Sequence, residues 1–345
     1  MTGLVKRRIS IESCRSLLPP RLMRVIRGVG LTAAVGAAGA AATLGWAYWE
    51  ARMPVLRQID VAGGSGNTGT DASGRVLRIL HVSDIHMHER ARFIGEFLRL
   101  VAAEHDFDLV VSTGDNLSDA KSLDLLLEAC APLLSKPGCF VLGSNDYYAT
   151  EAKPWASYLT SANHARTSKR AEEEPNLPWL SLVEAFKRAG WVDLSNRVDS
   201  LQVPLAGGST VRVGLAGVDD PHILRDHMPD LSQLSAGEVE LRLGLTHAPY
   251  QRVLDAFTAG GVDLVFAGHT HGGQLRIPGV GAVVTNTDVP RRYARGLHEW
   301  LAADARRGWP RVALVNVSAG LGTSPFAPVR FACRPEATLL TIALD

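Results

Sequence analysis

The sequence predicts an α/β protein in which mixed β-sheets form a layered sandwich flanked by helices. Short apolar runs typical of buried strands alternate with segments whose apolar residues recur at spacings of three and four. Strand-like runs become more frequent after residue 262, and this change after the early strand–helix alternation favours a layered sandwich of mixed sheets. The chain has 345 residues, of which 46% are hydrophobic, so it is long enough to bury a sizeable core. One apolar helix is expected ahead of this domain.

Residues 1–27 form a basic leader with seven basic side chains and one acidic side chain, a charge of +6. The rest of the chain holds the other 29 of the 36 basic residues and 34 of the 35 acidic residues, a charge of −5. A mildly acidic body lacks the basic face that nucleic-acid binding requires, so no nucleic-acid partner is expected.

Residues 28–49 carry no charged side chain and are long enough to cross a bilayer as a helix. Trp46, Tyr48 and Trp49 lie at the downstream end, where an aromatic belt would meet the membrane interface, and the basic leader lies upstream. This pattern predicts a single-pass transmembrane anchor in the cytoplasmic membrane, with the lipid bilayer as a partner and the body outside.

Three alternatives to this anchor remain open. Arg7-Arg8 and the alanines near the end of the apolar stretch also fit an export signal that is cleaved, after which the body would be exported. The stretch also fits a buried Ala/Gly-rich helix of the globular domain. A leader that only docks on the membrane surface would leave the body in the cytoplasm.

The segment 50–75 combines a strand with a linker. A strand-like piece at 55–61 precedes a Gly/Ser/Thr-rich tract at 63–74, and we expect this strand to pair with the next one, at 76–82, as a hairpin with a long loop. The main domain is expected to span 76–345. Its further strands are expected at 109–112, 139–142, 211–215, 241–245, 262–267, 312–317 and 338–342, with helices around 93–101 and 123–130.

Charged, amide and imidazole residues follow five of these strands at the points where the strands end. Alone, each has an ordinary explanation, because an Asp after a strand often caps a helix and a lone His is usually hydrogen-bonded in a core. Together they lie where α/β sheets place ligands. The candidate metal ligands in this pattern are Asp84, His86, Asp115, Asn145, His247, His269 and His271.

The spacing within this set favours a metal centre. Asp84 and His86 are two residues apart, as are His269 and His271, so each pair would point to one side of an extended segment. Carboxylate and imidazole donors suit Mn, Fe or Zn. Six or seven candidates are too many for one ion and fit two metal ions that share a bridging carboxylate, an arrangement that clamps the attacking and leaving oxygens at phosphorus.

The D-x-H, G-D, G-S-N-D, H and G-H-x-H blocks, in this order, resemble those of the calcineurin-like metallophosphoesterases over about residues 76–345. The tail Gly320-Leu321-Gly322-Thr323 and Pro328-Val329-Arg330 is similar to that of bacterial membrane-associated members. The resemblance implies the fold of that family for 76–345. It assigns Asp84, His86 and His271 to one metal and His247 and His269 to the other, with Asp115 bridging.

The activity implied by the resemblance is hydrolysis of phosphoester bonds (mono-, di- or pyrophosphate) by a hydroxide that bridges the two metals and attacks phosphorus. A phosphorylated substrate is therefore expected, and the anchor favours one associated with the membrane. Asn116 is placed to donate to the phosphoryl group, with capping of the next helix as the alternative. The alternative function is a metal-binding scaffold on the same fold with little or no turnover.

One block departs from the family pattern, which usually reads G-N-H-D. This chain has Gly143-Ser144-Asn145-Asp146, so an alignment without a gap puts Ser144 in the place of the Asn ligand. We expect Asn145 to ligate instead, after a shift of one residue, because an amide oxygen is the better donor. The imidazole of the block is absent, and His88, His222 or His227 is a candidate substitute.

Overall fold

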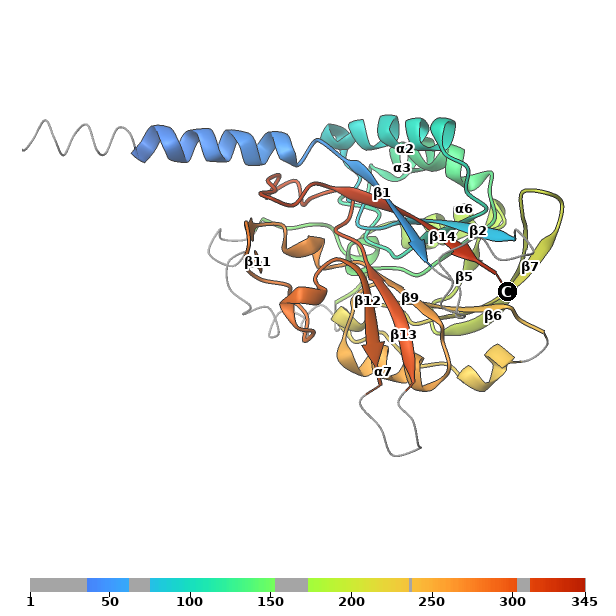
Figure 1. Cartoon of the computed structure of the whole chain (residues 1–345). Helices are drawn as coiled ribbons and strands as arrows, with labels where there is room; N and C mark the ends of the chain where they lie inside the picture. Colours follow the sequence, from blue (N-terminus) through green and yellow to red (C-terminus); the bar gives the residue numbers. More distant parts are fainter. Residues whose placement is uncertain (1–35, 62–74, 153–172, 236–237, 303–310, 345) are drawn as a thin grey trace, which may run out of the picture. The chain divides into compact units, whose positions relative to one another are not determined.

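The computed structural model describes residues 36–61, 75–152, 173–235, 238–302 and 311–344 (Figure 1). The chain divides into two compact units, Met1–Trp46 and Ala47–Asp345. The basic leader, residues 28–35 of the predicted anchor and the Gly/Ser/Thr-rich tract lie outside the described residues. Residues 36–50 are helical. No helix within the described ranges is long and apolar enough to cross a membrane.

Two six-stranded mixed sheets form the centre of the second unit, which confirms the predicted fold class. The first sheet has the order β1-β14-β2-β3-β4-β5 and the second β12-β13-β9-β8-β7-β6. The strands of the first sheet are β1 (Val55–Val61), β2 (Val76–Val82), β3 (Leu109–Ser112), β4 (Gly138–Phe140), β5 (Val192–Asp193) and β14 (Glu336–Ala343). Those of the second are β6 (Arg197–Pro204), β7 (Thr210–Gly217), β8 (Leu241–Leu245), β9 (Leu264–Ala267), β12 (Gly296–Leu301) and β13 (Val312–Val317).

The two sheets pack against each other, and helices cover their outer faces, as Figure 1 shows for α2 and α3 on one side and α7 on the other. Leu77 and Ile79 of β2 lie in the core between the sheets, whereas Leu80 and Val82 pack under the helices. Both faces of the central strands are buried, so these strands are mostly apolar, with a few buried polar residues such as His81 of β2 and Asn316 of β13. Within the described residues, the α-helices that follow β1 are α2 (Phe93–Glu104), α3 (Leu123–Leu134), α4 (Ser144–Tyr147), α6 (Trp179–Arg188) and α7 (Gln251–Ala259).

The predicted hairpin between β1 and β2 is wrong. β14 lies between them, parallel to β1 and antiparallel to β2. The C-terminal strand β14 is therefore the hydrogen-bonding partner of both β1 and β2, which do not pair with each other.

Short elements connect several of the strands. A two-stranded hairpin, β10 (Arg276–Ile277) and β11 (Gly281–Ala282), follows the 3₁₀ helix η5 (His271–Gly273). The remaining 3₁₀ helices are η1 (Glu89–Ala91), η3 (Pro221–Ile223), η4 (Leu231–Ser235) and η6 (Arg291–Tyr293). β2, β3 and β4 run parallel in one sheet, and β7, β8 and β9 run parallel in the other, so each group presents its carboxyl ends together.

Candidate metal centre

The structure brings the predicted ligands together at the carboxyl ends of β2, β3, β4, β8 and β9. Four of them are buried, whereas the other three are half-buried and leave one side of the cluster open. The buried side chains are Asp84, His86, Asp115 and His247, and the half-buried ones are Asn145, His269 and His271.

A first group of donors consists of Asp84, His86 and His271, which offer ligand atoms within 4.8 Å of one another. The Nε2 atoms of His86 and His271 are 3.1 Å apart. The Oδ1 atom of Asp84 lies 3.6 Å from His271 Nε2. One carboxylate and two imidazoles thus face the same small volume.

A second group lies beside the first, and Asp115 is placed between the two. Its Oδ2 atom is 3.5 Å from His86 Nε2, and its Oδ1 atom is 3.4 Å from His247 Nε2. His247 Nε2 is in turn 3.3 Å from His269 Nδ1. Asp84, Asp115 and His247 also offer ligand atoms within 4.8 Å of one another. Asp115 therefore has one oxygen toward each group, the position of a shared ligand.

The backbone that carries these side chains is not extended, contrary to the expectation for the two pairs spaced by two residues. Asp84 and His86 have φ of 49° and 45°, and His269 and His271 have φ of 67° and 49°. Asp115 has φ of 56°. The side chains converge because tight turns follow the strands, and each left-handed residue costs about 1–3 kcal/mol that the surrounding structure must offset. Backbone strain of this kind is typical of functional sites.

Asp146 holds the turns after β3 and β4 together. Its carboxylate accepts the backbone N–H groups of Asp115 (3.0 Å), Asn116 (2.8 Å) and Gly143 (2.9 Å). The Asn116 side chain is fully buried and donates to Asp146, at 3.3 Å. Asn116 does not cap α3, whose N-cap is Ser122. Its donation to a phosphoryl group stays a prediction.

Asn145 contacts the carboxylate of Asp115 twice. Its backbone N–H donates to Oδ1 and its side-chain amide donates to Oδ2, each at 2.7 Å. Ser144 is buried, and its carbonyl oxygen accepts the N–H of Tyr148 at 2.9 Å. The structure thus places the Asn145 side chain, rather than Ser144, against the carboxylate that joins the two groups.

Two glycines allow the turns to approach the ligands this closely. A Cβ atom on Gly143 would overlap Asp115 Oδ1 and the His247 ring, and one on Gly268 would overlap Ser83 Oγ and Asp84 Oδ2. No larger residue fits at either position without displacing a ligand.

The donor set fits metal cations. Burial lowers the pKa of His86 to about 4 and that of His269 well below its usual value, so both rings are neutral and hold free lone pairs. His86 Nδ1 and His269 Nε2 are buried with no hydrogen-bond partner among the described residues. Burial, together with the neighbouring Asp115, raises the pKa of Asp84 to about 6. A cation would relieve this crowding of carboxylates and lone pairs.

Of the three histidines considered as substitutes for the missing imidazole, only His222 is shown in contact with a candidate ligand. Its ring centroid is 4.1 Å from that of His269, and its Nδ1 atom is 3.1 Å from the Tyr250 hydroxyl. His227 is exposed, and its Nδ1 atom lies 3.0 Å from the Arg225 carbonyl. His88 is half-buried and directly precedes η1.

Two further residues beside the cluster were missed by sequence reasoning. Asp220 is fully buried after β7, and its Oδ2 atom has no partner within the described residues. Arg330 is also fully buried, and its Nη2 atom lies 3.2 Å from His271 Nδ1 and donates to the Gly322 carbonyl at 2.6 Å. Asp220 belongs to no motif, and Arg330 was noted only as part of the Pro328-Val329-Arg330 tail, since a single Asp or Arg in a loop resembles many surface residues.

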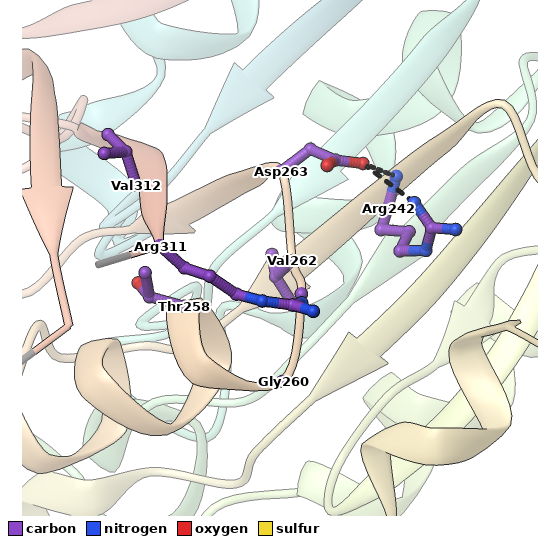
Figure 2. A pocket seen from close by; sticks show the side chains of 8 residues that line it. Arg242, Thr258, Gly260, Val262, Asp263, Arg311 and Val312 are labelled. Carbon is purple, nitrogen blue, oxygen red and sulfur yellow. Dashed lines mark hydrogen bonds and ion pairs between the residues drawn. The ribbon is translucent and has the colours of Figure 1, made fainter. Parts of the chain in front are cut away.

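A pocket of about 310 Å³ lies at the opposite ends of the strands of the second sheet (Figure 2). Among its lining residues, Arg242 and Val312 lie in the amino-terminal parts of β8 and β13, and Asp263 directly precedes β9. Figure 2 shows Arg242 paired with Asp263, at 3.7 Å. This pocket contains no histidine and is distinct from the metal cluster.

Residues 77–273 match the family model of calcineurin-like phosphoesterases, a segment that contains all seven candidate ligands and more than half of the chain. The chain belongs to the calcineurin-like phosphoesterase family. It is accordingly a metal-dependent phosphoesterase, and the candidate ligand groups described above agree with that class.

Similar proteins include two from Bacillus subtilis (strain 168). The uncharacterized protein YpbG is 26% identical over 271 residues, which cover 77% of this chain and 81% of YpbG. The uncharacterized metallophosphoesterase YkuE is 25% identical over 275 residues, covering 77% of this chain and 79% of YkuE. Among solved structures, the calcineurin-like phosphoesterase YfkN from Bacillus subtilis matches with a TM-score of 0.39 and 15% identity, covering 72% of this chain and 82% of YfkN.

Proposed function

We propose that this phosphoesterase hydrolyses a phosphoester or phosphoanhydride bond at a dinuclear metal centre on the outer face of a cytoplasmic membrane. The observation that carries the proposal is the convergence of two carboxylates and four imidazoles, which follow four strands, on one partly open cluster. A donor set of this size exceeds the needs of one ion and fits two ions that share Asp115.

Each ligand has a role in this proposal. Asp84, His86 and His271 would hold the first metal, and His247, His269 and Asn145 would hold the second, with Asp115 available to both. Two bound cations would supply a water-derived nucleophile at neutral pH and neutralise charge on the phosphoryl oxygens. Asn145 and Asn116 are the proposed amide donors beside the phosphoryl group. Asp146 orients the turns after β3 and β4 through its hydrogen bonds to both.

His222 is the proposed proton donor to the leaving group, in place of the imidazole that the Gly143–Asp146 block lacks. Its contact with the ring of His269 places it beside the second metal group. A substrate with a good leaving group, such as the phosphate of a pyrophosphate, would need less help from this donor.

We further propose that residues 28–49 anchor the chain and that the substrate is amphipathic, for example a lipid-linked pyrophosphate or a phospholipid headgroup. The basic leader, the uncharged stretch and the aromatic residues at its end support this placement. Trp49 is 66% exposed, which leaves its ring available to a membrane interface. Tyr48 is 44% exposed, with the Arg52 guanidinium over one face of its ring.

The activity is tested with purified protein loaded with manganese and assayed on bis-p-nitrophenyl phosphate. We expect metal-dependent turnover that Asp115→Asn abolishes and that Asp263→Asn, a matched change in the distant pocket, leaves intact. Absence of metal-dependent turnover, or turnover unaffected by Asp115→Asn, would favour a metal-binding scaffold.

The placement is tested separately with reporter enzymes fused to the C-terminus. A reporter that works only outside the cytoplasm is expected, and one that works only inside would contradict the outer location. Preference for soluble nucleotides over every lipid phosphoester tested would exclude the amphipathic substrate.

A further inference from the structure

A chain of buried side chains leads from the interior of the sandwich to Asp84. The side-chain amide of Asn316 on β13 lies 2.8 Å from His81 Nδ1 on β2. His81 Nε2 lies 3.0 Å from Thr113 Oγ1, which is 2.7 Å from Ser83 Oγ. Ser83 Oγ donates to Asp84 Oδ2 at 2.6 Å. All five residues are buried, so no bulk water competes for these bonds.

The direction of every hydrogen bond in this chain follows from its end at Asp84. An ionised carboxylate only accepts, so the single hydroxyl proton of Ser83 points to Asp84. Ser83 must then accept from Thr113, and Thr113 must accept from His81 Nε2–H.

The other end of the chain agrees with this direction. Burial lowers the pKa of His81 to about 3, so its ring is neutral and carries one proton. With that proton on Nε2, Nδ1 is an acceptor, and Asn316 donates to it through its side-chain N–H. One arrangement of protons satisfies all four contacts.

This series of hydrogen bonds also determines which carboxylate oxygen of Asp84 is available to a metal. Oδ2 accepts from Ser83 at 2.6 Å, and the His269 backbone N–H is shared between Oδ2, at 3.0 Å, and Oδ1, at 3.1 Å, so only the Ser83 bond distinguishes the two oxygens. Oδ1 faces His271 Nε2 at 3.6 Å. Oδ1 is therefore the atom that the turn presents to the first metal group.

We propose that the donor chain Asn316–His81–Thr113–Ser83 is a positioning device that fixes the rotamer of Asp84 and makes it a ligand through Oδ1 alone. This inference rests on the proposed function, because Asp84 acts there as a metal ligand. His81 and Asn316 are positioning residues, since they reach the metal only through Asp84. The Thr113 hydroxyl acts in the same way, whereas the Thr113 carbonyl lies 2.7 Å from His247 Nδ1, a contact that replacement of its side chain leaves in place. Residues that hold a ligand in this way typically change metal affinity or activity about 10- to 100-fold when removed.

The first test reads the proton position in the unaltered full-length protein. Long-range ¹⁵N–¹H spectra of the detergent-solubilised, zinc-loaded chain distinguish the two neutral imidazole tautomers, and the His81 signals are assigned by their loss in His81→Gln. We expect the Nε2–H tautomer at pH 8 and at pH 5.5. An Nδ1–H tautomer, or a charged ring at pH 5.5, would overturn the proposed direction of the chain.

The second test breaks the chain at Thr113. Thr113→Val keeps the shape of the side chain but removes its hydroxyl, whereas Thr113→Ser keeps the hydroxyl. Thr258→Val is the matched control in α7, where the buried Thr258 hydroxyl donates to the Leu254 carbonyl at 2.8 Å. Titration with Mn²⁺ alone is followed by electron paramagnetic resonance. We expect Thr113→Val to weaken one of the two Mn²⁺ sites about 10- to 100-fold, and the other two variants to bind as the unaltered chain does.

Turnover of bis-p-nitrophenyl phosphate adds a second readout for the same variants. Thr113→Val should lower kcat with little change in KM, because the substrate does not touch Thr113. Unchanged Mn²⁺ binding in Thr113→Val, or an equal loss in Thr258→Val, would overturn the inference. If the unaltered protein shows no turnover at all, the proposed activity is wrong. The His81 tautomer and the Mn²⁺ affinities still test whether the hydrogen-bonded series Asn316–His81–Thr113–Ser83 positions Asp84. The tautomer test stands even if Thr113→Val does not fold.

Discussion

Replacing Asn145 with Ala probes the block that departs from the family pattern. The change removes the side-chain amide that lies 2.7 Å from Asp115 Oδ2 and leaves the backbone N–H that donates to Oδ1. A hydrogen bond to a charged group contributes about 1.5–3 kcal/mol. At 1.4 kcal/mol per tenfold change, its loss corresponds to an affinity for the second metal that is about 10- to 150-fold lower. Loss of the amide as a ligand acts in the same direction.

The assay is a titration of the metal-free protein with Mn²⁺ followed by calorimetry, with Ser144→Ala as the matched neighbour. Asn145→Ala should weaken one of two sites and leave the other unchanged, and Ser144→Ala should resemble the unaltered chain. The reasoning is refuted if Ser144→Ala loses a metal and Asn145→Ala does not, because Ser144 would then occupy the ligand position.

Three further outcomes follow from the structure. Burial lowers the pKa of His81 from an ordinary 6.5 to about 3 in the folded protein, so the unfolded chain binds a proton more readily between these pH values. The contribution of His81 to the free energy of unfolding is therefore complete above pH 6.5 and falls toward pH 3, by at most about 1.4 kcal/mol per pH unit. Urea titrations should show a shallower pH dependence of this free energy in His81→Gln, and equal slopes in the two proteins would contradict the prediction. Gly268→Ala should destabilise the fold by about 1–3 kcal/mol and reduce turnover, because the new Cβ would overlap Ser83 and Asp84. Gly39 has open space around it, so Gly39→Ala should change neither stability nor turnover. A fully active and stable Gly268→Ala would show that the turn can move. Arg330→Met should lower the thermal midpoint of unfolding and weaken metal binding at the first site, because the buried guanidinium donates to the Gly320 and Gly322 carbonyls beside His271. Normal metal binding in this variant would show that Arg330 does not support the first metal site.

The sandwich could be predicted because its central strands are buried on both faces. β2 and β9 are apolar runs that end in polar residues, and such runs are visible in the sequence alone. β6, with the sequence RVDSLQVP, and β12, with GLHEWL, were missed because they lie at the edges of the second sheet and carry polar side chains. The partner of β1 could not be predicted locally, since β14 comes from the other end of the chain.

The ligand set could be predicted because metal ligands combine a distinctive chemistry with a fixed place at strand ends. The turns that carry them could not, since left-handed φ values at Asp84 and His86 depend on packing against distant segments. His81 was read as part of an apolar strand, and nothing near it in the sequence indicates that it contacts Asn316 across the sandwich. Arg330 was likewise recognised only as part of a tail motif.

The measurement that tests the dinuclear centre most directly is anomalous X-ray diffraction from crystals of the manganese-loaded protein with phosphate. Two peaks are predicted, one in contact with Asp84, His86 and His271 and one in contact with His247, His269 and Asn145, with Asp115 touching both. A single peak, or metal bound away from these side chains, would contradict the proposed centre.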